Sequence, residues 1–97
     1  MLEIDDQLQI DDAELIERFV RASGPGGQNV NKVASAVELR FDVVNSAALP
    51  DALRARLLAR RDRRLTAEGV LVIQASRFRD QAKNREDARA RLVELIR

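Results

Sequence analysis

The spacing of hydrophobic and polar residues predicts two strands in the second and third quarters of the chain. In residues 36–43, apolar residues occupy every second position, at Val37, Leu39, Phe41 and Val43. This alternation is typical of a strand with one buried face and one solvent face. Residues 70–73, with the sequence VLVI, form a continuous apolar run bounded by polar residues, which predicts a central strand.

Two helices are predicted on either side of the second strand. Pro50 begins the first, at a position where its missing N–H group costs nothing. Its inner stripe consists of Leu53, Leu57, Leu58 and Leu65, and its remaining surface carries Arg54, Arg56, Arg60, Arg61, Arg63 and Arg64. Gly69 is expected to form a stop or turn. Asp80 caps the second helix, whose inner face holds Ala88, Leu92, Leu95 and Ile96.

Residues 14–21, with the sequence ELIERFVR, fit two kinds of element. Apolar residues recur there at helical spacing after the potential caps Asp11 and Asp12, and this periodicity slightly favours a helix. Phe, Val and Ile also suit a short strand. The whole pattern predicts an α+β fold, with a small mixed β-sheet of three to four strands, two α-helices packed on one face and a long loop between strands.

The amino-acid composition limits the kinds of catalytic and metal site that the chain can form. The 97 residues fit one domain, and an apolar content of 45% supports one modest core. The absence of Cys and His excludes disulfides, thiolate metal sites, an imidazole base and any Ser or Cys triad. We therefore expect neither a metal nor another cofactor. The chain has no apolar run long enough for a membrane span and no N-terminal targeting signal, so we expect a cytoplasmic protein.

The net charge of +1 conceals an uneven distribution. Residues 1–50 carry four basic and nine acidic residues, a net charge of −5, whereas residues 51–97 carry thirteen and seven, a net charge of +6. Arginine dominates the basic half and binds phosphate well. Solvated helix faces explain the same distribution equally well.

The loop at residues 21–35 is longer than a β-hairpin requires, and long irregular loops in compact domains are often functional. It holds Gly24, Pro25, Gly26 and Gly27, which could also form an ordinary turn. The loop does not fit a Walker A motif, because Lys32 is displaced. It does not fit a dinucleotide-binding motif either, because Asn29 replaces the third glycine.

The Gly26-Gly27-Gln28 tripeptide has a chemistry of its own. Two successive glycines allow unusual backbone angles and let a substrate approach the main chain. The N–H group of Gln28 could then stabilise the oxyanion of an acyl-transfer transition state, and its amide side chain could order a water molecule or a ribose hydroxyl. Such positioning needs no general base.

The sequence SGPGGQNVNKVASAVELRFD at residues 23–42 resembles the catalytic loop of class I peptide chain release factors and their ribosome-rescue relatives. Lys32, the LRFD sequence at residues 39–42 and the position of the motif near the N-terminus are most similar to the ArfB (YaeJ) type of rescue hydrolase. The helix after Pro50, the GVLVI strand and the sequence RDQAKNREDARARLV at residues 79–93 extend the resemblance over almost the whole chain.

The resemblance implies a ribosome-dependent enzyme that hydrolyses the ester of peptidyl-tRNA and releases nascent peptides from stalled ribosomes without reading a codon. Its partners would be the peptidyl-transferase centre of the large ribosomal subunit, ribosomal RNA and peptidyl-tRNA, with the protein acting as a monomer. The catalytic residues would be Gly26, Gly27 and Gln28, and the last is methylated in some relatives. Loop support or RNA contacts would come from Ser23, Gly24, Pro25, Asn31, Lys32 and Ser35. The resemblance also implies a strand at residues 15–21.

The rescue hydrolases continue into a basic C-terminal tail, which this sequence lacks. We therefore expect a single GGQ catalytic domain at residues 1–97, with weak activity on ribosomes. Two other hypotheses remain open. One is a non-enzymatic ribosome- or RNA-binding module that uses the arginines of residues 54–64, and the other is a release-factor-like protein that needs a partner chain.

Overall fold

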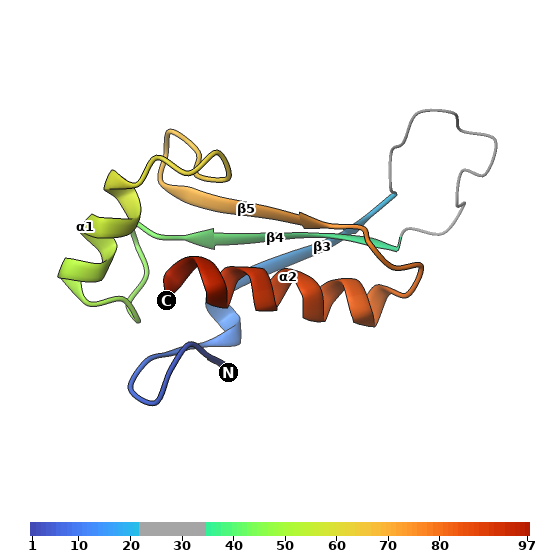
Figure 1. The fold of residues 1–97 in the computed structure, drawn as a ribbon, viewed down its shortest axis with the longest axis horizontal. Helices are drawn as coiled ribbons and strands as arrows, with labels where there is room; N and C mark the ends of the chain where they lie inside the picture. The colour runs from blue at the N-terminus through green and yellow to red at the C-terminus, as the bar shows by residue number, and fades with distance from the viewer. Residues whose placement is uncertain (22–34) are drawn as a thin grey trace.

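The computed structural model describes residues 1–21 and 35–97, which form an α+β fold (Figure 1). A three-stranded sheet has the order β3-β4-β5, with β3 at Leu15–Val20, β4 at Ala36–Asp42 and β5 at Val70–Ala75. A separate two-stranded sheet pairs β1 with β2, at Leu2–Glu3 and Gln9–Ile10. The α+β class predicted from the sequence is confirmed.

Helix α2 (Gln81–Ile96) lies along one face of the three-stranded sheet, as Figure 1 shows. Asp80 caps it as predicted, because its carboxylate accepts a hydrogen bond from the N–H of Lys83 at 3.1 Å. The predicted inner face of α2 is buried, as are the predicted apolar positions of β4. Together they form the core with other apolar side chains, among them Ile4, Ile10, Leu15, Leu71 and Ile73.

The sheet differs from the prediction in its strand directions. Every pairing that the structure describes is antiparallel, so the expected mixed sheet is wrong. The connection from β4 to β5 passes through α1 (Asp51–Ala59), which lies beyond the end of the sheet and does not cross its face (Figure 1). The chain therefore re-enters the sheet from the end where it left, and this produces antiparallel neighbours.

Strand β5 is an edge strand in the described sheet, whereas its apolar run predicted a central one. Its outer edge is partly paired by the chain just before it. Leu65 forms a bridge with Leu71, and the N–H of Val72 donates to the carbonyl of Arg64 at 2.8 Å. This pairing covers part of the otherwise free backbone edge of β5.

Helix α1 is shorter than its leucine pattern predicted. It ends at Ala59, and Arg61 then adopts a positive φ of 55° that helical backbone cannot accommodate. Leu57 is buried against the core, but Leu65 lies outside the helix. Gly69 forms the predicted turn before β5, with a φ of 84°.

Residues 15–20 form strand β3, so the strand implied by the family resemblance is confirmed and the helix favoured by periodicity is wrong. Asp11 does cap a helical segment, but only the single 3₁₀ turn η1 at Asp12–Glu14. The apolar side chains of β3 lie on both faces of the sheet, and Ile16 and Phe19 remain 59% and 48% exposed. An edge strand with this distribution does not show a period of two.

Within the described residues, neither helix has the length and apolar character that crossing a bilayer requires.

Candidate active site

The two strands that flank the glycine-rich loop hold its ends side by side. In the β3–β4 pairing, Val20 is opposite Ala36, so the chain leaves and re-enters the sheet at one end. Residues 21–35 connect these strands, as predicted. Most of the predicted site residues fall in 22–34, outside the described residues: Ser23, Gly24, Pro25, Gly26, Gly27, Gln28, Asn31 and Lys32.

Ser35 is the predicted site residue that the structure describes, and it lies immediately before β4. It is buried, and its carbonyl oxygen accepts a hydrogen bond from Nδ2 of Asn84 at 2.8 Å. This contact ties the C-terminal end of the loop to helix α2. The role of Ser35 in loop support stays a prediction.

Both polar atoms of the Asn84 side chain, Nδ2 and Oδ1, form hydrogen bonds here. The residue is fully buried, and its Nδ2 also donates to the carbonyl oxygen of Phe78 at 2.8 Å. Its Oδ1 accepts a hydrogen bond from the N–H of Phe78 at 2.9 Å. One side chain thereby joins the loop end, the turn between β5 and α2, and the first turns of α2.

The sequence contained a signal for Asn84 outside the apolar positions that predicted the helix. Asn84 lies four residues before Ala88, on the same helical stripe as Ala88 and Leu92. An amide on the inner face of a helix is rarely buried without hydrogen-bond partners. Its position therefore indicated a polar contact, although the identity of the partner required the structure.

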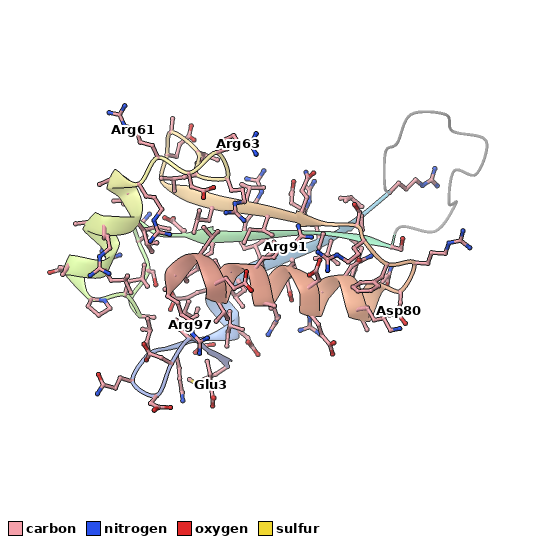
Figure 2. All side chains as sticks on the ribbon, in the orientation of Figure 1. Glu3, Arg61, Arg63, Asp80, Arg91 and Arg97 are labelled. Atoms are coloured by element: carbon pink, nitrogen blue, oxygen red, sulfur yellow. The ribbon has the colours of Figure 1, made fainter. Side chains whose placement is uncertain are left out.

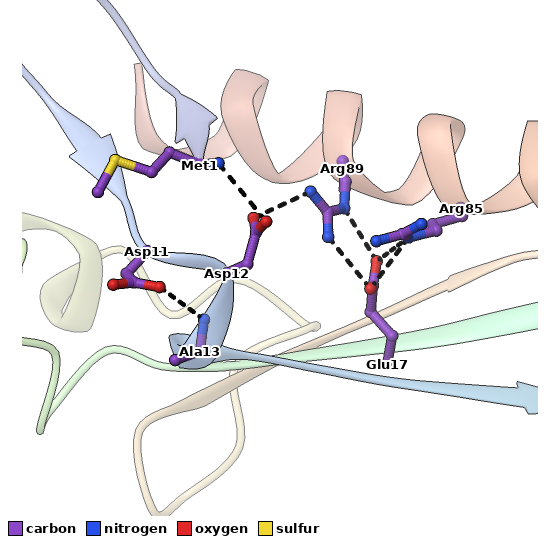
Figure 3. A network of polar contacts seen from close by, with 7 residues as sticks. All are labelled: Met1, Asp11, Asp12, Ala13, Glu17, Arg85 and Arg89. Carbon is purple, nitrogen blue, oxygen red and sulfur yellow. Dashed lines mark hydrogen bonds and ion pairs between the residues drawn. The ribbon is translucent and has the colours of Figure 1, made fainter.

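A second connection fastens β3 to α2. The carboxylate of Glu17 accepts hydrogen bonds from Arg89 at 3.0 and 3.1 Å and from Nε of Arg85 at 3.1 and 3.2 Å (Figure 3). Arg89 also reaches Asp12 at 3.2 Å. The hydrogen bonds from Arg89, followed by the positive charges of both arginines, lower the pKa of Glu17 below its ordinary value of 4.5. Both strands that carry the loop are thus attached to one helix.

The other face of the sheet has a hollow near the loop end. The hollow has a volume of about 310 Å³, and its lining includes Arg18, Arg21, Gln74 and Ser76. Glu38 also lines the hollow and is buried, with its carboxylate 3.5 Å from Nε of Arg18 and 3.3 Å from Nε of Arg40. The hollow therefore presents polar groups and charges of both signs close to Ala36, where the loop rejoins the sheet.

The described residues supply a frame for the loop. No cluster of carboxylates in residues 1–21 and 35–97 could hold a metal ion. The whole sequence contains neither imidazole nor thiol. What the described residues provide is a fixed pair of loop ends, so any catalytic group of the kind predicted belongs to residues 22–34.

Comparison with known proteins finds a matching protein family and similar relatives. The sequence profile of the RF-1 domain matches residues 2–97. The peptidyl-tRNA hydrolase ArfB of Pseudomonas putida is 54% identical over 96 residues, which cover 99% of this chain and 69% of that protein.

More distant relatives cover smaller shares of their own length. The mouse protein named large ribosomal subunit protein mL62 is 31% identical over 78 residues, or 80% of this chain and 38% of that protein. Peptide chain release factor 2 of Streptomyces avermitilis is 37% identical over 75 residues, or 63% of this chain and 20% of that protein.

Proposed function

The chain belongs to the RF-1 domain family, and we propose that it is a peptidyl-tRNA hydrolase that releases nascent peptides from stalled ribosomes. The observation that carries this proposal is the 54% identity to the ArfB hydrolase over 99% of the chain, a range that includes Gly26-Gly27-Gln28. Release factors among the relatives also favour an interaction with ribosomes and peptidyl-tRNA.

The reaction is hydrolysis of an ester by water. The water oxygen bonds to the carbonyl carbon, the bond to the terminal ribose oxygen breaks, and that oxygen leaves with a proton. We assign the main-chain N–H of Gln28 to the negative oxygen of the tetrahedral intermediate, where one such donor contributes roughly 3–4 kcal/mol. The Gln28 side chain positions the water, and Gly26 and Gly27 let the ester approach the backbone.

The remaining predicted site residues support this loop or contact RNA. Ser23, Gly24 and Pro25 precede the tripeptide, and Asn31 and Lys32 follow it. The buried hydrogen bond from Asn84 to Ser35 supports this assignment, because a donor aimed at a transition state must be held within a fraction of an ångström. The attachment of Glu17 to α2 contributes at the other strand.

We propose further that residues 1–97 act as one catalytic domain, as a cytoplasmic monomer. The loop tip would enter the peptidyl-transferase centre of the large subunit. Catalysis by uncharged groups that position the water and the ester suits this assignment, because the chain contains no histidine to act as a base. In this proposal the substrate and the ribosome supply every other group that the reaction needs.

Peptide release from ribosomes stalled on a truncated mRNA tests the proposal. We expect peptide release that depends on both this protein and ribosomes. Gln28→Ala should lower the release rate less than Gly27→Ala, because Gln28→Ala keeps the main-chain donor. Asn45→Ala is the control, because it changes an exposed residue that follows the end of β4 distant from the loop. This variant should release peptide at the normal rate. Binding that weakens with salt but never releases peptide would instead establish a non-enzymatic RNA-binding module.

A further inference from the structure

The cationic side chains of the described residues divide into those that bind a carboxylate or carbonyl group and those that form no ion pair. Arg54 donates to the carbonyls of Val43, Val44 and Leu49 at 2.7–2.9 Å, and Arg64 binds Asp62 through Nε and Nη2 at 2.9 and 3.0 Å. The Arg64 contacts lower the pKa of Asp62 to about 2. Similar contacts to carboxylates or carbonyls engage Arg18, Arg40, Arg60, Arg85, Arg89, Arg91 and Arg97.

The remaining cations are exposed and make no ion pair with any residue that the structure describes. They form two groups, one on α1 and the chain that follows it and the other at the end of the sheet that carries the glycine-rich loop. The α1-end group consists of Arg56, Arg61 and Arg63, and the loop-end group consists of Arg21, Arg77, Arg79 and Lys83. Figure 2 shows Arg61 at the α1 end of the molecule, Arg63 beside β5, and Asp80, from the turn that carries Arg77 and Arg79, at the far end.

The loop-end group is held at the root of the glycine-rich loop. Arg21 follows Val20, the last residue of β3. Arg77 and Arg79 flank Phe78, whose N–H and carbonyl are both bound by the Asn84 side chain that also binds Ser35. Lys83 lies in the first turn of α2, with its ammonium 5.9 Å from the centre of the Phe78 ring.

We propose that Arg21, Arg77, Arg79 and Lys83 bind backbone phosphates of ribosomal RNA around the root of the loop. This inference rests on the proposed function. Guanidinium groups bind phosphates in a bidentate manner, and side chains that form no ion pair with a described residue lose none there when RNA arrives. Asp80 is the acidic residue within this stretch, and its carboxylate already caps α2.

The length of the loop decides which RNA the loop-end group meets. From Arg21 to Gly26 the chain advances five residues, so it spans at most about 18 Å. If the tripeptide reaches the ester, the loop-end group lies behind it, within that distance. The RNA that surrounds the ester at this range in a ribosome-dependent reaction is ribosomal RNA, and we assign the phosphates to it.

Two triple variants with equal charge changes test the assignment. The loop-end variant is Arg77→Gln/Arg79→Gln/Lys83→Gln, and the α1-end control is Arg56→Gln/Arg61→Gln/Arg63→Gln. Because all six side chains are exposed, both variants should keep the urea midpoint of the parent protein. Binding to ribosomes without tRNA is measured across a range of KCl concentrations, together with the ribosome concentration for half-maximal peptide release.

The loop-end variant should bind ribosomes at least about tenfold more weakly, with a slope of log K against log[KCl] shallower by about 2. Its half-maximal ribosome concentration should rise by the same factor, whereas the control should change by less than about threefold. Equal losses in both variants, or none, would overturn the assignment. So would a loss seen only on ribosomes that carry peptidyl-tRNA, because the phosphates would then belong to the tRNA. If no protein releases peptide but the binding difference persists, the proposed function fails and the RNA surface stands.

Discussion

Replacing Asn84 by Ala tests whether one buried amide holds the loop end in place. The side chain makes hydrogen bonds of 2.8 Å to Ser35, and of 2.8 and 2.9 Å to the carbonyl and N–H of Phe78. Ala cannot make any of these contacts. The substitution therefore removes the contact between α2 and the loop end while leaving the cap at Asp80 intact.

The expected cost follows from the burial of the three groups. The bond to Ser35 is buried, and an unpaired buried acceptor costs about 1–3 kcal/mol. Both bonds to Phe78 are partly buried, so water can replace them at about 0.5–1 kcal/mol each. We expect a loss of about 3 kcal/mol, a large share of the 5–15 kcal/mol by which such a domain is stable.

Urea denaturation measures this loss directly, as a lower midpoint with an unchanged slope. Asn45→Ala is the matched control, because the Asn45 side chain donates to Asp42 at an exposed site and should contribute less than about 1 kcal/mol. Peptide release by Asn84→Ala, measured where the variant is fully folded, should also fall. If the two Asn→Ala variants were equally stable, the idea that Asn84 fixes the loop end would be refuted.

Two further substitutions test the frame. Glu17→Gln should lose about 1–3 kcal/mol at neutral pH, since it breaks the ion pair with Arg89. The folded-state pKa of Glu17 is lowered, so this stabilisation is complete above the ordinary pKa of 4.5 and disappears as pH falls through the folded-state value. The difference in urea midpoint between the parent protein and Glu17→Gln should therefore shrink from pH 7 to pH 2. A difference that stays constant would contradict the assignment. Gly69→Ala should lower the thermal midpoint by several degrees, because φ is 84° and an added Cβ would overlap Cγ2 of Val44. An unchanged midpoint would show that this turn relaxes without cost.

The sequence pattern predicted elements best where one face is apolar and the other polar. Strand β4 alternates because α2 covers the face of Val37, Leu39 and Phe41, whereas the opposite face carries Glu38, Arg40 and Asp42, of which Glu38 is also buried. Helix α2 has both a cap and a continuous inner stripe. Each feature is local in the sequence, so periodicity detects it.

Features that depend on distant contacts could not be predicted in this way. The end of α1 depends on a positive φ at Arg61, which a non-glycine residue does not signal. The buried Ile4 follows strand β1 and the buried Ile10 ends strand β2, and both strands are too short to show a period. The partner of Asn84 lies 49 residues away.

The candidate site was predicted from a motif. Gly-Gly-Gln has a chemical rationale, but only the longer resemblance around it indicated peptidyl-tRNA as the substrate. The RF-1 domain match confirms the family. The roles of Gly26, Gly27 and Gln28 stay predictions, which activity measurements can test.

The rate of peptide release by Gly27→Ala is the most direct measurement. A Cβ at residue 27 restricts the backbone angles and obstructs the approach of the ester to the Gln28 N–H. On stalled ribosomes at saturation, we predict a rate at least about 100-fold below that of the parent protein, the scale for loss of one oxyanion donor. Ribosome binding should change little. Release at the parental rate would contradict the account.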